Sequence, residues 1–282
     1  MTMLPQRRRA RGRRVEDEGR MSLVEHLREL RNRMFKAAIA IVIGMALAWV
    51  FYDQLFALLK DPFDGLREDA EARGLDVTLA LTDVTGPFFL QLKISLVAGI
   101  VLSSPVWLYQ IWGFVTPGLH KTERRYTLAF IATAVPLFLA GCYLAYLILP
   151  KGLSLLIGFT PANEGVENLI TLGNYLNFVI RMVLVFGLGF ELPVFIVLLN
   201  LVGVLTYARL KSWRTGFWFG ILVFAAVATP TGDPITMLLL GIPIIVLFEI
   251  SMLIAKLTDR RRRLASNEPD YQQLDDDETS KI

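Results

Sequence analysis

Residues 103–125 read SSPVWLYQIWGFVTPGLHKTERR, and the rest of the chain can be placed around them. An apolar run ends among aromatic residues that include Trp112 and Phe114, a Pro-Gly break and a charged cluster follow, and a new apolar run begins at Tyr126. Trp and Tyr favour the headgroup level of a bilayer because their rings are apolar and their N–H and O–H groups need partners. Basic residues after such aromatics are typical of a cytoplasmic loop. The segment therefore predicts a membrane helix that surfaces in the cytoplasm, turns and crosses the bilayer again.

The composition of the whole chain favours an integral membrane protein. Its 282 residues are 54% apolar and 20% charged, with a mean hydropathy of +0.49. Several membrane spans best explain that apolar excess. The single cysteine, Cys142, excludes a disulfide within the chain, and there is no Cys/His cluster, phosphate-binding glycine loop or nucleophile elbow. These features argue against a metalloenzyme or an ATPase, and we expect no metal and no cofactor.

Apolar runs long enough to cross a bilayer, about 20 residues each, predict an all-α membrane protein with six transmembrane helices. We place the spans at about residues 36–53, 88–110, 126–149, 175–200, 213–229 and 234–255. Lys and Arg are concentrated before the first span and after the second, fourth and sixth, whereas acidic residues dominate residues 53–87. Because basic residues favour the cytoplasmic side, this alternation predicts that both termini are cytoplasmic.

Three regions are expected along the chain. Residues 1–21 form a basic N-terminal arm without apolar periodicity, which we expect to be disordered. Residues 22–257 form the membrane domain, and residues 258–282 form a basic and then acidic cytoplasmic tail that we also expect to be disordered.

Local patterns refine the membrane domain. Residues 22–36 predict an amphipathic helix lying in the interface ahead of the first span, with Ser22 and Glu25 as a capping box. In the long external loop, residues 66–74 predict a short surface helix. Thr82 or Thr85 is expected to cap the second span.

Four charged residues lie within the predicted spans: Lys93, Arg181, Glu191 and Glu249. Lys93 and Arg181 lie near the external ends of their spans, where long side chains can extend to the headgroups. Glu249 lies near the cytoplasmic end, and we expect it to extend to the headgroups or to pair with Lys256 or the arginines at 260–263.

Glu191 differs because it lies near the middle of the fourth span. An ionisable group at that depth is costly unless it faces water, a partner or the protein interior. Gly187, Gly189 and Pro193 weaken or bend the helix around it. Two interpretations stay open: a functional acid, which we favour, and a hydrogen-bonded glutamic acid that holds two helices together.

Five motifs occur in order along the chain. They are HLRELRNR before the first span, TDVTGPFF entering the second, SPVWLYQIWGFVTPGL followed by KTERR, FELPV in the fourth span, and TPTGD before IPIIVLFEI in the sixth. Each motif is weak alone, but their order, spacing and topology over about residues 22–257 together resemble the TatC family, the receptor subunit of the twin-arginine protein translocase.

The resemblance implies a non-enzymatic receptor in the bacterial cytoplasmic membrane. Such proteins bind the Arg-Arg motif of signal peptides on folded cargo at the cytoplasmic face. They assemble with single-span TatA and TatB subunits into an oligomeric complex within the membrane lipid, and the protonmotive force drives export. No nucleic acid partner is implied.

The resemblance also implies four groups of site residues. These are Glu29, Arg31, Phe114 and Glu123 for signal-peptide binding, Glu191 as the intramembrane acid, Thr229 and Asp233 for partner contact, and Pro62, Asp83 and Phe88 in the external loops. Asp233 has a second interpretation, in which it caps the sixth helix with Pro234 at the first helical position.

Glu29 and Glu123 have the chemistry that such recognition needs. A guanidinium pair is always charged and prefers planar carboxylate acceptors. Both acids lie on the predicted cytoplasmic side among basic residues, and Trp112 and Phe114 offer apolar contact. Ordinary pairing with Arg31, Arg33 or Arg124 is the alternative, and the resemblance leads us to favour recognition.

Two other function classes compete with a receptor. A proton-coupled secondary transporter would use Glu191, but matching broken helices in two halves are not evident, because the only central acid lies in the fourth span. An intramembrane enzyme would need a nucleophile–base pair or metal ligands at depth, and no His lies in any predicted span.

Overall fold

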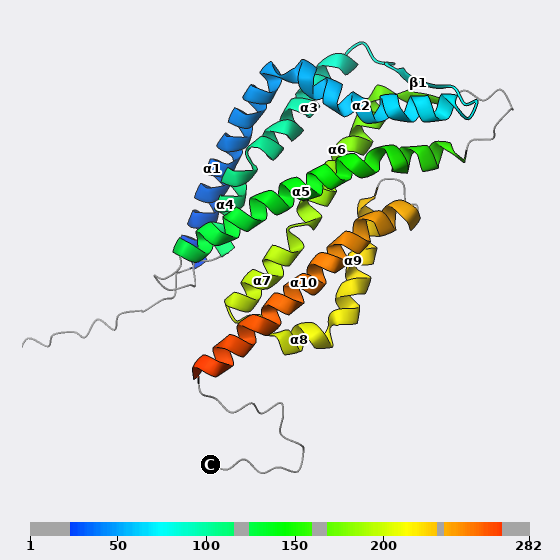
Figure 1. The fold of residues 1–282 in the computed structure, drawn as a ribbon. Coiled ribbons are helices and arrows are strands. Elements are labelled where there is room, and N and C mark those ends of the chain that lie inside the picture. The colour runs from blue at the N-terminus through cyan, green and yellow to red at the C-terminus, as the bar shows by residue number, and fades with distance from the viewer. Residues whose placement is uncertain (1–22, 116–123, 160–167, 230–233, 267–282) are drawn as a thin grey trace, which may run out of the picture.

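The structure is a computed structural model that describes residues 23–115, 124–159, 168–229 and 234–266. Helices run along a common direction, and one helix and a two-stranded sheet lie across one end (Figure 1). The elements are α1 (Leu23–Val50), α2 (Tyr52–Glu71), β1 (Val77–Ala80), α3 (Gly86–Leu102), α4 (Ser104–Val115), α5 (Arg124–Ile157), β2 (Asn168–Thr171), α6 (Leu172–Gly189), α7 (Leu192–Leu201), α8 (Tyr207–Ser212), α9 (Arg214–Ala228) and α10 (Pro234–Ser266).

The predicted class, an all-α membrane protein, is confirmed. Within the described residues, four helical segments are long and apolar enough to cross a bilayer: Val24–Val50, Phe130–Ile157, Leu172–Leu201 and Pro234–Leu264. The pair α3 and α4 makes a fifth if the two are one bent span, and α9 is a shorter apolar helix. The count of six spans stays a prediction.

The N-terminal part of the membrane domain differs from the expectation. Residues 23–50 form one continuous helix, so the expected interfacial helix and the first span are a single element. This helix packs along α3, and the two backbones touch where Gly44 faces Gly99. A Cβ at Gly44 would lie 2.7 Å from the Gly99 carbonyl oxygen, so the absence of side chains permits the close approach.

The predicted second span is broken at Ser103, where α3 and α4 meet at 59°. Pro105 explains the break because it has no N–H to continue the helical hydrogen bonds. The Ile100 carbonyl near the bend accepts a hydrogen bond of 2.8 Å from the Trp107 indole Nε1. Trp107 is therefore a structural part of the bend, and it is buried.

The fourth span also breaks, as its glycines and proline predicted. Helix α6 ends at Gly189 and α7 begins at Leu192, with Pro193 in its first turn. Glu191 occupies the position before the first residue of α7, although its side chain does not cap that helix. The break places the acid between two helical segments inside the protein.

The end of the bundle that carries α2 was only partly predicted. Residues 66–71 of the expected short helix are instead the last part of a 20-residue helix that begins at Tyr52, and residues 72–74 form a turn after it. Its buried residues are Pro62, Phe63, Leu66 and Ala70. The strands β1 and β2 pair in parallel, with Val77 opposite Asn168 and Ala80 opposite Thr171. Each strand has four residues, too few for an alternating pattern to show in the sequence.

Two expected helix starts have different outcomes. Thr85 occupies the N-cap position of α3, but its hydroxyl makes no capping hydrogen bond. Pro234 is the first residue of α10, as expected. Helix α10 runs through Ser266, so residues 258–266, which we expected to open the tail, continue the helix. The arm at 1–21 and the rest of the tail lie outside the described residues.

The segments predicted to be cytoplasmic lie at one end of the bundle. The start of α1, the end of α4, the start of α5, helix α8 and the end of α10 are all at the lower end in Figure 1. Helix α2 and β1 lie at the opposite end. A core cluster beside the lower end includes Trp107, Trp112, Phe130 and Phe138, and a larger cluster fills the remainder of the bundle.

Candidate functional site

A polar surface cavity lies between the start of α1 and helix α4. Its volume is about 500 Å³. The lining residues are Glu25, Arg28, Glu29, Asn32, Arg33, Lys36, Tyr109 and Gln110. The six on α1 recur at spacings of three and four, which is why one helix face presents them together. Carboxylates, amides, a phenol and cations can bind a charged ligand through ion pairs and hydrogen bonds.

Glu29 is held in the cavity by Arg33, one turn further along α1. Arg33 donates from Nε and Nη2 to the same carboxylate oxygen, Oε1, at 2.8 and 2.6 Å. The other oxygen, Oε2, is buried and has no hydrogen-bond partner among the described residues. Of the three pairings considered from the sequence, the structure shows the one with Arg33. This pairing uses one carboxylate oxygen and leaves the acceptor capacity of the other unused within the described residues.

The position of Arg33 depends on a glycine in α4. The Arg33 guanidinium lies so close to Gly113 that a Cβ at this glycine would overlap Nη1 and lie 2.9 Å from Cζ. Only a residue without a side chain leaves that space. Gly113 therefore links α4 to the orientation of the Glu29 carboxylate, a role that the sequence did not reveal.

Phe114 lies beside the same surface. Its ring stacks on the His26 ring, with centroids 4.4 Å apart and planes 17° from parallel. This contact joins the first turn of α1 to the end of α4. The loop that carries Glu123 begins directly after it in the chain.

The other residues predicted for this surface have different outcomes. Arg31 is exposed, but it does not line the cavity, because positions two apart on a helix face different directions. Trp112, expected to offer apolar contact, is 1% exposed and packs against Phe130 and Phe195 in the core. It cannot contact a ligand without unfolding that cluster. Glu123 lies outside the described residues.

Glu191 is buried at the break between α6 and α7. It is 6% exposed, and neither carboxylate oxygen has a hydrogen-bond partner among the described residues. The interpretation of a glutamic acid hydrogen-bonded to a neighbouring helix therefore has no support in these contacts. Gly189 beside it packs against Ile244 of α10, and Gly187 packs against Phe138 and Cys142 of α5. The acid thus lies where three spans meet closely.

The residues predicted to contact partner helices are only partly described. Thr229 is buried, and its hydroxyl donates to the Ala225 carbonyl of its own helix at 2.9 Å. Asp233 lies outside the described residues. No contact between these two can therefore be assigned.

The three external-loop residues occupy separate places. Pro62 is buried inside α2. Asp83 is exposed on a second polar cavity, of about 460 Å³, that Lys93 also lines. Phe88, on α3, is 57% exposed and meets the Trp49 ring edge-on. They form no single cluster.

Two charged residues within the spans have partners that the sequence did not predict. Lys93 donates to the Asn177 side-chain oxygen on α6 at 2.7 Å, rather than only reaching towards headgroups. Glu249 accepts from Arg214 and from the Trp218 indole on α9, both at 2.9 Å, and not from Lys256 or the arginines beyond it. The polar Asn177 within an apolar span was the one available signal for the first pair.

Comparison with known proteins places the chain in a family. Residues 25–243 match the family model described as Sec-independent protein translocase protein (TatC). The Sec-independent protein translocase protein TatC of Frankia casuarinae is 44% identical over 280 residues, which cover 95% of this chain and 75% of that protein. The TatC of Aquifex aeolicus is 35% identical and covers 86% of this chain and 98% of its own length.

A solved structure agrees with the sequence matches. The crystal structure of a twin-arginine translocase receptor, TatC, in the detergent DDM superposes with a TM-score of 0.70 at 34% identity. The match covers 82% of this chain and 99% of that one. The chain therefore belongs to the TatC family, the membrane components of the Sec-independent protein translocase.

Proposed function

We propose that this chain is the signal-peptide receptor and core subunit of a twin-arginine translocase, and that the cavity at Glu29 binds the arginine pair. The observation that carries the proposal is the Glu29 carboxylate: Arg33 holds one oxygen, and the other has no hydrogen-bond partner among the described residues. A guanidinium is the donor that best fits a fixed, planar carboxylate.

The proposal needs a second acceptor because the motif has two arginines. Arg28, Arg33 and Lys36 line the cavity, and they repel incoming cations. Glu123 is our candidate for the second acid, since its loop begins beside Phe114. The stacked rings of Phe114 and His26 offer an apolar surface for residues that flank the arginine pair.

The orientation proposed for the membrane follows from the distribution of charge. The start of α1, which carries Arg28 and Arg33, lies at the same end of the bundle as the basic end of α10 (Figure 1). Acidic residues are frequent on α2 at the other end, among them Asp61, Asp64, Glu68 and Asp69. We therefore propose a multi-pass protein of the bacterial cytoplasmic membrane with both termini inside the cell. It assembles with single-span TatA and TatB subunits in an oligomeric complex.

Glu191 is assigned to a step after signal binding. It is buried far along the chain from the Glu29 cavity, at a break where helices can move relative to one another. We propose that this acid couples transport to the protonmotive force.

Glu29→Gln tests the receptor proposal directly. The amide keeps the shape but loses the charge, so we expect the affinity for a twin-arginine signal peptide to fall about tenfold, the usual loss for a charge-assisted hydrogen bond. Glu71→Gln is a matched control, because Glu71 also forms an i,i+4 ion pair, with Arg67, at the opposite end of the bundle. Fluorescence anisotropy with Arg-Arg and Lys-Lys peptides would measure the peptide affinities of both variants. Equal affinities for the two variants would remove Glu29 from the site.

Glu123→Gln tests the second acceptor. We expect it to abolish export of a twin-arginine cargo while the protein still inserts in the membrane at a normal level. Cell fractionation with a folded reporter measures export, and immunoblotting of membranes measures insertion. Normal export by this variant would show that another group accepts the second arginine.

A further inference from the structure

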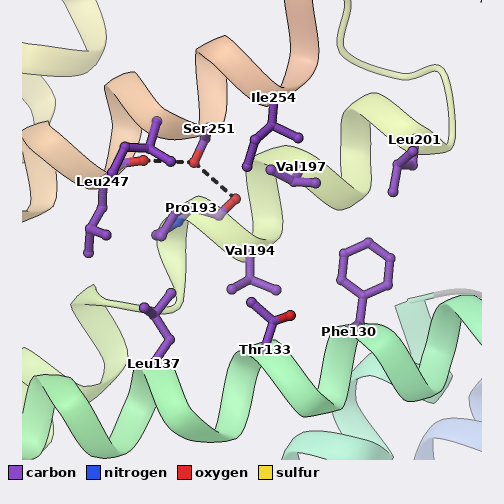
Figure 2. Close-up of a pocket in the computed structure, with 11 residues that line it drawn as sticks. Phe130, Thr133, Leu137, Pro193, Val194, Val197, Leu201, Leu247, Ser251 and Ile254 are labelled. Carbon is purple, nitrogen blue, oxygen red and sulfur yellow. Dashed lines mark hydrogen bonds between the residues drawn. The ribbon is translucent and has the colours of Figure 1, made fainter. Parts of the chain in front are cut away.

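An apolar cleft outside the Glu29 surface lies between α5, α7 and α10. Its volume is about 320 Å³. Figure 2 shows the residues that line it. The lining side chains include Phe130 and Leu137 of α5, Val194 and Val197 of α7, and Ile254 of α10. It lies in the half of the spans nearer the C-terminal end of α10.

The polar groups on this lining do not make the cleft a site for a polar ligand. The Ser251 hydroxyl lies 2.8 Å from the Leu247 carbonyl oxygen and 3.3 Å from the Pro193 carbonyl oxygen, and it donates within the protein (Figure 2). The remaining surface is almost entirely hydrocarbon. An apolar cavity of this kind stays free of water and accepts apolar groups.

The dimensions of the cleft fit an acyl chain. Leu247 and Ile254 line it seven residues apart, which corresponds to about 10 Å along α10. A methylene group fills about as much space as a water molecule, about 30 Å³, so a cleft of this volume and length has room for a stretch of acyl chain.

A guanidinium lies at the end of the cleft towards the basic end of α10. Arg262 donates from Nη2 to the carbonyl of Leu201 at 2.7 Å, and Leu201 itself lines the cleft. Arg209 of α8 donates to the Val204 carbonyl in the same turn, so a second guanidinium lies nearby. One acid, Asp259, is close in sequence, but its carboxylate oxygens accept from Asn200 and from the Tyr207 backbone.

The face of α10 that lines the cleft leads to these charges. Leu247, Ile250, Ser251 and Ile254 recur at helical spacing, and the same face continues to Arg261 and Arg262. Both arginines are exposed. An apolar slot that ends in fixed guanidiniums matches an anionic amphiphile, with its chain in the slot and its phosphate at the basic end.

We propose that the cleft between α5, α7 and α10 binds one anionic phospholipid, with an acyl chain between Leu137, Val197 and Ile254 and the phosphate on Arg262. The orientation proposed above assigns this lipid to the cytoplasmic leaflet. The site is separate from the Glu29 cavity, and its failure would leave the receptor proposal unchanged.

Native mass spectrometry of the purified full chain tests the site. Phosphatidylglycerol and phosphatidylcholine with the same acyl chains are the two probes. We expect phosphatidylglycerol to be retained preferentially, and Arg262→Gln to lower its retention about fivefold, the effect of one basic side chain on an anionic lipid. Arg260→Gln is the matched control, because it removes the same charge from the same run without touching Leu201. Equal retention of the two lipids, or an equal loss in the two variants, would overturn the headgroup assignment.

A substitution that fills the cleft tests whether the lipid acyl chain lies there. Val197→Phe places a ring where the acyl chain would lie, and we expect it to reduce retention of both lipids. Val246→Phe makes the same change at an exposed position on α10 outside the cleft and should leave retention unchanged. The proposal is wrong if the two variants retain the same amount of lipid.

Photo-crosslinking in cells keeps the proposal testable if Val197→Phe does not fold. A photoreactive amino acid at position 197 should give an adduct of phospholipid mass, as the lipid-exposed position 246 should. An adduct of protein mass at 197, or no adduct at 197 while 246 reacts, would overturn the proposal.

Discussion

The orientation of the Glu29 carboxylate depends on two neighbouring residues. Arg33 fixes one oxygen, Gly113 makes room for Arg33, and the second oxygen has no partner in the part of the chain that the structure describes. The sequence could predict that Glu29 is a notable acid among basic residues. It could not predict the part played by Gly113, because that glycine is 80 positions from Arg33 and has no side chain to suggest a role.

Gly113→Ala tests this arrangement at the level of one methyl group. The added Cβ overlaps the Arg33 guanidinium, so Arg33 must move and Glu29 loses its fixed orientation. We expect the affinity for a twin-arginine peptide to fall up to about tenfold, the value of a hydrogen bond to a charged group. Gly216→Ala is the control, because a Cβ there meets nothing within 4 Å. Unchanged binding by Gly113→Ala would mean that Arg33 does not orient the acid.

Glu191→Ala separates recognition from the later step. Glu191 does not line the Glu29 cavity, so we expect signal-peptide binding to stay within about twofold of the unaltered protein, the scatter of an independent substitution. Export should be impaired because the buried acid is lost. Peptide binding and reporter export, measured on the same membranes, show whether Glu191 acts in recognition or in the later step. Loss of peptide binding would instead assign Glu191 to recognition or folding.

At the scale of elements, helix breaks were easier to predict than helix partners. The break in the fourth span could be predicted from Gly187, Gly189 and Pro193, since each weakens a helix locally. The joining of the expected interfacial helix to the first span could not be predicted, because the amphipathic and apolar patterns run into each other without a stop signal. The strands β1 and β2 depend on pairing between residues about 90 positions apart, which leaves no local pattern.

The close approach of α1 and α3 predicts a strong effect of one small substitution. A Cβ at Gly99 would lie 2.5 Å from the Met45 backbone nitrogen, and a backbone atom cannot move away without separating the helices. We expect Gly99→Ala to lower the free energy of unfolding by about 2 kcal/mol, typical of overpacking. Gly220→Ala on α9 meets open space and should be neutral or slightly stabilising. Thermal unfolding in detergent measures both, and equal midpoints would contradict the contact.

At the scale of the whole molecule, the charge pattern was the most informative part of the sequence. The alternation of basic and acidic segments could predict which connections lie at the same end of the bundle, because basic connections favour the cytoplasmic side of a membrane. The pattern could not predict contacts across the bundle, such as Lys93 with Asn177, which are 84 positions apart. The candidate site was also predicted only in part. Glu29 and Phe114 lie beside one surface, as expected, whereas Trp112 belongs to the core.

Cysteine labelling tests the proposed orientation. The only native cysteine, Cys142, is buried, so Cys142→Ala gives a background without reactive thiols. In that background, Arg260→Cys should react with an impermeant maleimide only in inverted vesicles. Glu71→Cys on α2 should react only in intact spheroplasts. The reverse result would invert the topology and place the Glu29 cavity outside the cell.

The central claim is that the Glu29 cavity binds the arginine pair of a signal peptide. Photoreactive amino acids at positions 32 and 110, which line the cavity while leaving Glu29 and Phe114 intact, test it most directly. We predict crosslinks to a twin-arginine signal peptide at both positions, none to a Lys-Lys peptide, and none from a probe at position 71 at the opposite end. Crosslinks that persist with the Lys-Lys peptide, or that appear equally at position 71, would contradict the claim.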